Sequence, residues 1–337
     1  MKQALPTYGT GLVASLPSEW FFDSLVFCAP EPWETVRRQF PQPPRAAVVP
    51  ESMEQRVLEK QIDALPMADT VFGIGGGSAC DAAKMYAHRR GARLVLVPTV
   101  LSVDAPFTKA VGVRVNHCVR YVGEVFPERL LVDFDILRQS PKRLNRAGIG
   151  DVLSIFTALP DWRLGRDFRA EAYDEGIAGE SQRLLDDLFA GADDIRECNE
   201  RGLKLIAELY VGEVALCERM GNSRPEEGSE HYFAYALEAV THKSYIHGEL
   251  IAFSVLLAAL YQEQNVERVL DFLRLVDVAY LPDQIGVSWD EVEQALLGLP
   301  DFLGHEPQLL YGVFHHKGMD RSAAGELRER FRAAVKK

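Results

Sequence analysis

A run of three glycines between an apolar stretch and a helical pattern constrains this chain more than any other feature. Gly75, Gly76 and Gly77 follow a strand-like run and lead through Ser78 into a segment with helical spacing. Residues without side chains let the backbone approach a phosphate closely, and the N–H groups at a helix start favour negative charge. Because the three glycines match neither the spaced dinucleotide fingerprint nor the P-loop pattern, a purely structural turn stays open as an alternative.

Short apolar runs alternate with helical patterns between residues 25 and 135. Strands are expected at 25–27, 46–49, 70–74, 94–97, 120–122 and 129–132, and helices at 32–40, 52–65 and 79–88. Such alternation predicts βαβ units and a parallel sheet. The glycine turn would then lie at the carboxyl end of a strand, where open sheets bind ligands.

The second part of the chain has a different pattern, with long apolar helical segments. They are expected at 149–159, 180–189, 203–220, 232–240 and 250–265. The 337 residues also exceed what one hydrophobic core usually supports. We therefore predict an α/β fold with a Rossmann-like parallel-sheet domain at 1–146, followed by an all-helical domain at 147–337.

Composition excludes several classes of protein. A formal net charge of −12 without any long Lys/Arg run argues against nucleic-acid binding. The apolar segment at 250–261 is too short to cross a bilayer, and no signal-peptide pattern opens the chain, so we expect no membrane insertion. The five cysteines are scattered without a CxxC pair, which favours reduced structural thiols and a cytoplasmic location.

Three polar residues stand out in the apolar helical part. Asp151 follows a glycine turn, His231 ends a Gly-Ser-Glu-His run, and His247 precedes a long apolar stretch. Each alone could be an ordinary helix-end or core residue. Together, one carboxylate and two imidazoles could hold a divalent metal with open positions, which is the arrangement that polarises a substrate oxygen.

Five sequence blocks occur in a fixed order along the chain. They are GGGSxxDxAK at 75–84, PTxxSxDAPFT at 98–108, AGIGDxLS at 147–154, SRPxxGSEH at 223–231 and HGE at 247–249. Together they resemble the iron-containing alcohol dehydrogenase and dehydroquinate synthase-like superfamily, with the glycerol-1-phosphate dehydrogenase branch as the nearest match. The likeness extends over about residues 20–265.

The resemblance implies roles for individual residues. Asp151, His231 and His247 would be the metal ligands, and the metal would be Zn, Fe(II) or Ni(II). The nucleotide, NAD or NADP, would be bound by Gly75, Gly76, Gly77, Ser78, Asp81, Thr99 and Ser102. Asp104 would lie on the nicotinamide and substrate side and is our first candidate catalytic residue. We also expect a homo-oligomer, either a dimer or larger.

Three further residues are candidates from their position or charge. His242 follows His231 by eleven residues, about three helical turns, so it could share a helix face and carry a proton, although a helix end there is the alternative. Lys109 and Arg224 could bind an anionic group of the substrate. For any single Lys or Arg, a solvated surface position is the alternative.

Some positions depart from the family pattern. The loop after the first strand reads Cys-Ala-Pro-Glu-Pro at 28–32, where many members have an acid for the adenosine ribose, so NAD and NADP both stay open. Glu226 and Glu227 replace small residues beside a site expected for a phosphorylated substrate. The tail at 302–337 lacks the family's usual ending. An uncharged polyol therefore stays open as the substrate.

We predict a metal-dependent, NAD(P)-linked dehydrogenase of a small polyol or polyol phosphate. One alternative is a sugar-phosphate cyclase of the dehydroquinate synthase type, but that branch has a Glu as first metal ligand, where this chain has Asp151. Another alternative is a non-catalytic nucleotide-binding relative. Three retained ligand residues argue against it, because a dead site has no physical need for them.

Overall fold

The computed structural model describes residues 5–116 and 118–336, which form two compact units. Of the described residues, the first unit contains 5–116, 118–145 and 198–207, and the second contains 146–197 and 208–336. The predicted division into domains at 1–146 and 147–337 stays a prediction. The compact units add one feature to it, because a short later segment groups with the first unit.

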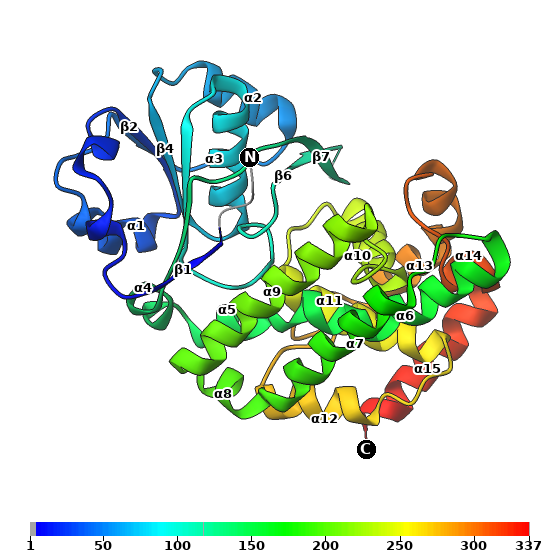
Figure 1. Ribbon diagram of the computed structural model, residues 1–337. Coiled ribbons are helices and arrows are strands. Elements are labelled where there is room, and N and C mark those ends of the chain that lie inside the picture. Colours follow the sequence, from blue (N-terminus) through cyan, green and yellow to red (C-terminus); the bar gives the residue numbers. More distant parts are fainter. Residues whose placement is uncertain (1–4, 117, 337) are drawn as a thin grey trace. The chain divides into compact units, whose positions relative to one another are not determined.

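A six-stranded sheet forms the framework of the first unit (Figure 1). Its strands, all parallel, are β1 (Thr7–Gly9), β2 (Ser24–Cys28), β3 (Ala46–Val48), β4 (Thr70–Gly75), β5 (Arg93–Pro98) and β8 (Arg129–Asp133), in the spatial order β1-β8-β5-β4-β2-β3. The chain runs outward from β2 to β3 and then returns to β4 on the other side of β2. The strand order therefore reverses between β2 and β4, which is where such sheets bind ligands.

Helices cover both faces of this sheet because alternate strand residues point to opposite sides. On one face, Val26, Phe72 and Val95 share a buried cluster with residues of α1 (Pro30–Val36) and α4 (Phe134–Gln139). On the other face, Phe27 of β2 contacts Tyr86 of α3 (Gly77–Arg90), with ring centroids 6.1 Å apart. The remaining helices of this part are α2 (Gln55–Asp63) and α5 (Lys142–Ala147).

Two features of the first unit differ from the sequence expectation. The strand predicted at 120–122 belongs to β7 (Cys118–Glu124), which pairs antiparallel with β6 (Ala110–Val115) in a separate hairpin. The edge strand β1 was not expected, because three residues are too few to show a period.

A buried lysine connects α3 to the hairpin. Lys84 of α3 donates to the Ala110 carbonyl at 2.8 Å and pairs with Asp81 at 3.0 Å.

The second unit is helical. Its helices are α6 (Ile149–Arg169), α7 (Glu175–Ala190), α8 (Ala192–Glu197), α9 (Glu200–Met220), α10 (Ser229–Thr241), α11 (His247–Tyr261), α12 (Glu267–Val276), α13 (Trp289–His305), α14 (Val313–Lys317) and α15 (Arg321–Val335), and the start of α9 groups with the first unit. Helix α11 is apolar all round and buried, as expected of a central helix, and packs against α6, α10 and α15. The predicted fold class, a parallel-sheet α/β part followed by a helical part, is confirmed.

Helix α6 continues ten residues beyond its predicted end at Leu159, through Pro160. A proline inside a helix leaves the carbonyl four residues earlier without its usual N–H donor. Here the side-chain amide of Gln264 donates to that carbonyl, of Phe156, at 3.3 Å, and Gln262 donates to the Thr157 carbonyl at 2.9 Å. These two glutamines explain why the helix is not broken, and their positions a hundred residues away explain why local sequence could not show it.

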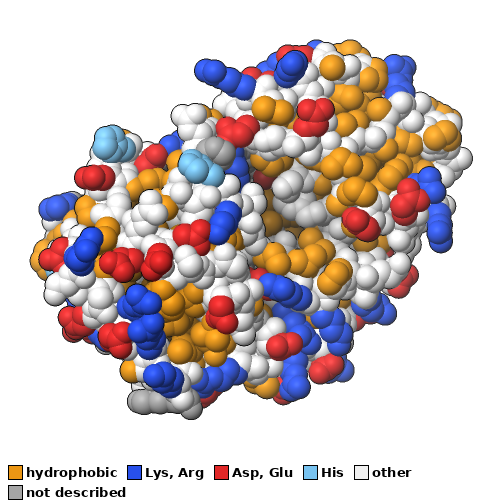
Figure 2. All heavy atoms as spheres, turned by 180° about the vertical axis from the view of Figure 1, so that it is seen from behind, with side chains coloured by type: hydrophobic (Ala, Val, Ile, Leu, Met, Phe, Trp, Pro, Cys, Tyr) orange, Lys and Arg blue, Asp and Glu red, His pale blue; other side chains and the backbone are white. Residues whose placement is uncertain are grey.

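Three structural observations concern the surface, the helices and the thiols. Lys/Arg and Asp/Glu side chains are interspersed on the face drawn in Figure 2, without a basic stripe among the described residues shown there. In residues 5–116 and 118–336, no helix combines the length and the apolar character needed to cross a membrane. The five cysteines are thiols and not disulfides, and burial raises the pKa of Cys28 to about 11.

Candidate functional site

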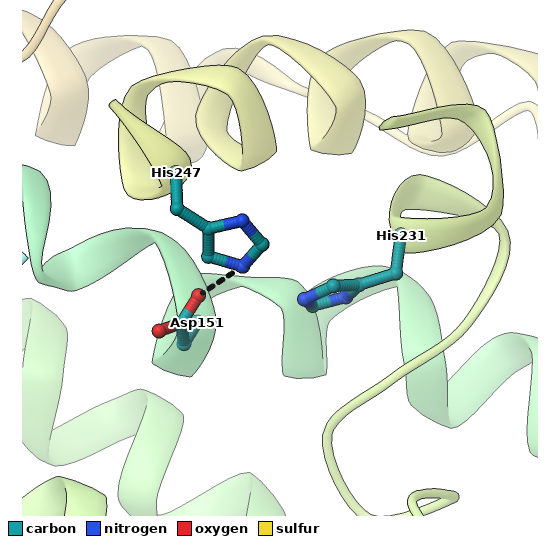
Figure 3. A group of neighbouring side chains, drawn as sticks. All are labelled: Asp151, His231 and His247. Atoms are coloured by element: carbon teal, nitrogen blue, oxygen red, sulfur yellow. Dashed lines mark ion pairs between the residues drawn. The ribbon is translucent and has the colours of Figure 1, made fainter. Parts of the chain in front are cut away.

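The first turns of α6, α10 and α11 bring Asp151, His231 and His247 together (Figure 3). Ligand atoms of the three side chains lie within 4.8 Å of one another, and His247 Nε2 is 3.1 Å from Asp151 Oδ1. Two ligands that each lie about 2.1 Å from one ion are at most about 4.2 Å apart. Small side-chain movements would therefore let all three reach one divalent ion.

Two glycines allow the helices that carry Asp151 and His247 to touch. A Cβ added to Gly150 would lie 2.4 Å from the Gly248 Cα, and one added to Gly248 would lie 1.7 Å from the Ala147 carbonyl oxygen. No larger residue fits at either position, so the backbones of α6 and α11 are in direct contact beside the two ligand residues. This close approach gives the glycines of the AGIGD and HGE blocks a physical reason.

A buried glutamate orients His231. The Nδ1 of His231 lies 2.9 Å from Glu230 Oε1, which also accepts from the Gly228 N–H at 2.6 Å. The other carboxylate oxygen of Glu230 accepts from the Thr157 hydroxyl at 2.6 Å. With Nδ1–H donating to Glu230, the lone pair of Nε2 is left for a metal, which is a common arrangement for ligand histidines.

The charges around His231 are unusual for a buried imidazole. Burial opposes its charged form, but the hydrogen bond to Glu230 and the charges of Glu227, Glu230 and Asp151 outweigh burial and raise its pKa to about 9. A metal ion at this position competes with a proton for the imidazole, because only the deprotonated nitrogen is a ligand. The negative surroundings that favour a proton also favour a divalent cation.

In the first unit, the glycine turn connects β4 to α3. Gly75 ends the strand, Gly76 is the N-cap and Gly77 is the first helical residue, with no side chain capping the helix. The first N–H groups of α3 therefore have no side-chain partner from the cap and are suited to an anion. The Thr99 N–H donates to the Gly75 carbonyl at 2.9 Å, which holds the end of β5 beside the turn.

The other residues predicted for the nucleotide side lie near this turn in sequence but differ in surroundings. Ser78 is exposed at the start of α3, and Ser102 and Asp104 are half-buried in the loop after β5. Asp81 instead pairs with the buried Lys84 and would contact any side chain at Gly112 of β6, so it faces the hairpin. The ligand roles assigned to all four stay predictions.

The two predicted anion-binding residues both have carboxylate partners. Arg224 is 1% exposed, and its Nε donates to Glu171 Oε2 at 2.8 Å. Lys109 Nζ lies 3.1 Å from Glu124 Oε2. A role in binding substrate stays a prediction for both, and for Arg224 the geometry adds a structural role, since burial leaves its guanidinium inside the helical unit.

His242 ends α10 instead of continuing it. It is the exposed C-cap residue, with φ of 53° in the left-handed region. The helix end that was the alternative in the sequence is thus present. Proton transfer by His242 stays a prediction.

The buried Asp161 is a polar centre of the helical unit; the sequence, in which Asp161-Trp162 resembles the same family branch, had suggested only a packing role for it. Its Oδ2 accepts from the Ser229 N–H at 2.7 Å, and its Oδ1 accepts from Gln262 at 2.7 Å and the Val313 N–H at 2.8 Å. Burial raises the pKa of Asp161 to about 6 although these hydrogen bonds favour the ionised form. The resemblance of Asp161-Trp162 to the family branch was the signal in the sequence, but it did not reveal these hydrogen-bond partners.

Comparison with known proteins identifies relatives of both the sequence and the fold. The family described as iron-containing alcohol dehydrogenase matches residues 35–141. A glycerol-1-phosphate dehydrogenase [NAD(P)+] of Aeropyrum pernix is 31% identical over 82% of this chain and 76% of that protein, and the one of Hyperthermus butylicus is 33% identical over 67% and 65%.

Solved structures show the same fold. Glycerol dehydrogenase from Schizosaccharomyces pombe aligns with a TM-score of 0.70 at 16% identity, covering 100% of this chain and 91% of that one. An iron-containing alcohol dehydrogenase from Corynebacterium glutamicum aligns with a TM-score of 0.68 at 13% identity, covering 99% and 97%. At these identities the likeness supports the fold and says nothing further about substrate.

Proposed function

Because the chain belongs to the iron-containing alcohol dehydrogenase family, in its glycerol-1-phosphate dehydrogenase branch, we propose that it interconverts a small polyol phosphate and the corresponding ketone. The chain is an NAD(P)-linked alcohol dehydrogenase. The substrate of choice is then glycerol 1-phosphate, with dihydroxyacetone phosphate as the ketone, as in the names of the relatives. The convergence of Asp151, His231 and His247 is the observation that carries the proposal.

The donor set at this centre fits a divalent metal. One carboxylate and two imidazoles suit Zn, Fe(II) and Ni(II) alike, and Glu230 already fixes the ring of His231. When bound, such an ion supplies Lewis-acid polarisation of the substrate oxygen. The chain's own part is to hold three ligands on touching helices and to leave the remaining positions open for a substrate.

The glycine turn is proposed to hold the pyrophosphate of the nucleotide. Its backbone and the uncapped start of α3 provide N–H donors, while Thr99 and the loop with Ser102 and Asp104 extend the site along the same edge of the sheet. Negative charge at the start of a helix is stabilised by about 0.3–1 kcal/mol even without direct hydrogen bonds. The nicotinamide would lie on the side of Asp104.

A surface pocket at the carboxyl ends of β2 and β3 suits the adenosine end of the nucleotide. It has a volume of about 320 Å³ and is lined by Cys28, Pro30, Glu31, Trp33, Glu34, Ala47 and Val49. It adjoins the turn, since the Ala29 N–H donates to the Ile74 carbonyl at 3.1 Å. Glu34 is paired with Arg37 at 2.6 Å, which leaves Glu31 as the acid whose charge a ribose would meet.

We therefore expect the protein to prefer NADH over NADPH, because Glu31 accepts a hydrogen bond from a ribose hydroxyl and repels a 2′-phosphate. In Glu31→Gln, the ratio of the Kd values for NADPH and NADH should fall by about fivefold. This is the change expected for a surface charge about 8 Å from a dianion when the dielectric constant is that of water. Fluorescence titration measures both constants. The matched control is Glu34→Gln, whose charge is already paired; equal changes in the two variants would contradict the assignment.

An uncharged polyol is the second candidate substrate, and one observation favours it. Glu227 is half-buried and close enough to His231 to raise the pKa of that imidazole, so the candidate metal centre has a negative neighbour where a phosphate is expected. Burial, and after it the charges of Glu226 and Glu227 among others, raise the pKa of the nearby Cys217 thiol. Of the two glutamates, only Glu227 contributes to the raised pKa of His231.

Comparing dihydroxyacetone phosphate with dihydroxyacetone decides between the two substrates. If the proposal holds, kcat/KM is higher for the phosphorylated ketone, and Glu227→Ser should raise that preference by at least about tenfold, because two unit charges 8 Å apart at an effective dielectric of 20 interact by about 2 kcal/mol. Glu226→Ser is the matched control and should have a smaller effect. A preference for the uncharged ketone would move the assignment to a polyol dehydrogenase.

The two alternatives considered for the sequence lose support from the relatives. The matched proteins are named as dehydrogenases, which argues against a sugar-phosphate cyclase and against a non-catalytic relative. Oxidation of NADH and NADPH by the two ketones, each with Zn, Fe(II) and Ni(II), tests the activity and the metal together. The cytoplasmic location and the homo-oligomer stay predictions.

A further inference from the structure

A short segment near the C-terminus is held by side chains from three distant parts of the chain. In residues 310–313, here called the C-terminal strap, the Leu310 N–H donates to the Tyr232 hydroxyl at 3.0 Å. The Tyr311 N–H donates to Glu171 at 3.1 Å, and the Tyr311 carbonyl accepts from Arg224 at 2.7 Å. These hydrogen bonds hold the segment through its backbone N–H and carbonyl groups. Such contacts do not depend on side-chain type, so they leave no motif in the sequence of the strap.

The strap also reaches the start of the helix that carries His231. The Val313 N–H and the Ser229 N–H donate to the two oxygens of the same carboxylate, Asp161, at 2.8 and 2.7 Å. Ser229 is the first residue of α10 and lies two positions before His231. One buried side chain therefore joins the strap to the first turn of α10.

The strap and the first turn of α10 are also closely packed where they meet. A Cβ added to Gly312 would lie 2.4 Å from the Ser229 hydroxyl oxygen and 2.5 Å from Asp161 Oδ2. A Cβ added to Gly228, the N-cap of α10, would lie 2.9 Å from the same Asp161 oxygen. The strap and the N-terminus of α10 therefore both pack against Asp161, with no room for a further atom.

Two side chains of helix α6 contact the first turn of α10. Thr157 and Asp161 lie one helical turn apart, on one face. Thr157 donates to Glu230, the residue that orients the ring of His231, and Asp161 holds Ser229. Helix α6 thus holds the first turn of α10 at two points, and at the second point Asp161 is also bound by the Val313 N–H of the strap.

We propose that the C-terminal strap and Asp161 form a positioning device for His231, which sets the affinity of the candidate metal centre from a part of the chain that contains no ligand. The inference rests on the proposed metal site. Its physical basis is that a displaced first turn of α10 moves the imidazole away from Asp151 and His247. Loss of partners behind a metal ligand typically lowers metal affinity by 10–100-fold.

Gly312→Ala tests the device, with Gly325→Ala as its matched control. Both substitutions add one methyl group to a glycine of the C-terminal region, but a Cβ at Gly325, in α15, meets nothing within 4 Å. Co(II) and Zn(II) titrations of the chelator-treated full-length protein should show a Kd raised by about 10–100-fold in Gly312→Ala and unchanged in Gly325→Ala. NADH binding should be unchanged in both, since a general loss of folding would weaken metal and nucleotide together.

Asp161→Asn is the second variant, because it keeps the side-chain volume and should fold even where Gly312→Ala does not. In asparagine, one of the two carboxylate oxygens is replaced by an NH2 group, which cannot accept a hydrogen bond from an N–H donor. The same weakening of metal binding is therefore expected. Metal affinities equal to wild type in a folded Asp161→Asn protein would overturn the inference.

A readout without metal separates this inference from the proposed function. Nitrogen-15 shifts of the His231 ring in the metal-free protein, assigned with His231→Gln, report the hydrogen bond of Nδ1 directly. A shift in Asp161→Asn but not in Gly325→Ala supports positioning, and an unmoved ring overturns it. Wild-type protein that binds no metal would instead overturn the metal proposal, whatever the ring reports.

Discussion

Replacing His247 by alanine is expected to remove the bound metal and nearly all dehydrogenase activity. His247 is the best of the three ligands to remove. It is the first residue of helix α11 and its side chain is 29% exposed, so truncation leaves no large cavity. His231 is less suitable, since its removal would leave the buried carboxylate of Glu230 without the imidazole. We expect metal content to fall from about one ion per chain to near zero, and kcat/KM to fall at least about a thousandfold, equivalent to about 4 kcal/mol.

The matched control for this variant is His305→Ala. His305 is exposed at the end of α13, and its Nδ1 lies 2.7 Å from the Asp301 carbonyl oxygen. Elemental analysis, steady-state kinetics and thermal unfolding should show wild-type behaviour for this control. NADH binding should survive in both variants, because the glycine turn belongs to the first unit. Full metal content and activity in His247→Ala would remove the basis of the proposed metal centre.

The candidate metal ligands were identifiable from the sequence because each occurs in a short ordered block that resembles a known family. Residue spacing alone could not bring them together, since Asp151 is about eighty residues before His231. Their closeness depends on Gly150 and Gly248, which allow two helix backbones to touch. The glycines are visible in the sequence, but what each would meet is visible only in the fold.

Other features depend on partners that lie far away in the sequence. Asp161 acquires its role from Ser229, Gln262 and Val313, which lie 68, 101 and 152 positions away. The burial of Arg224 depends in the same way on Glu171, 53 positions away. A charged residue read from sequence alone is assigned to solvent or to a ligand, because its buried partner cannot be seen. Long apolar segments such as α11 were predictable for the opposite reason, since their pattern is local.

The second large effect is expected at the glycine turn. A valine at Gly76 should raise the Kd for NADH by at least about a hundredfold, which corresponds to about 2.7 kcal/mol. Gly76 is the N-cap of α3, and a Cβ there already lies 3.1 Å from Val100 Cγ2, so two further carbons must occupy the space in front of the first N–H groups of the helix. That space is where a pyrophosphate would accept hydrogen bonds.

Metal content makes this test specific. The three candidate ligands all belong to the second unit, so Gly76→Val should keep its metal while losing the nucleotide, the reverse of His247→Ala. Gly76→Ala should weaken NADH binding less, because it adds only one carbon atom. The Val100 side chain can make room for that atom by shifting a few tenths of an ångström. Gly298→Val, at a glycine of α13 whose Cβ meets nothing within 4 Å, is the matched control and should bind NADH normally. If folded Gly76→Val bound NADH as tightly as this control, the glycines would be a structural turn and the nucleotide would have to lie elsewhere.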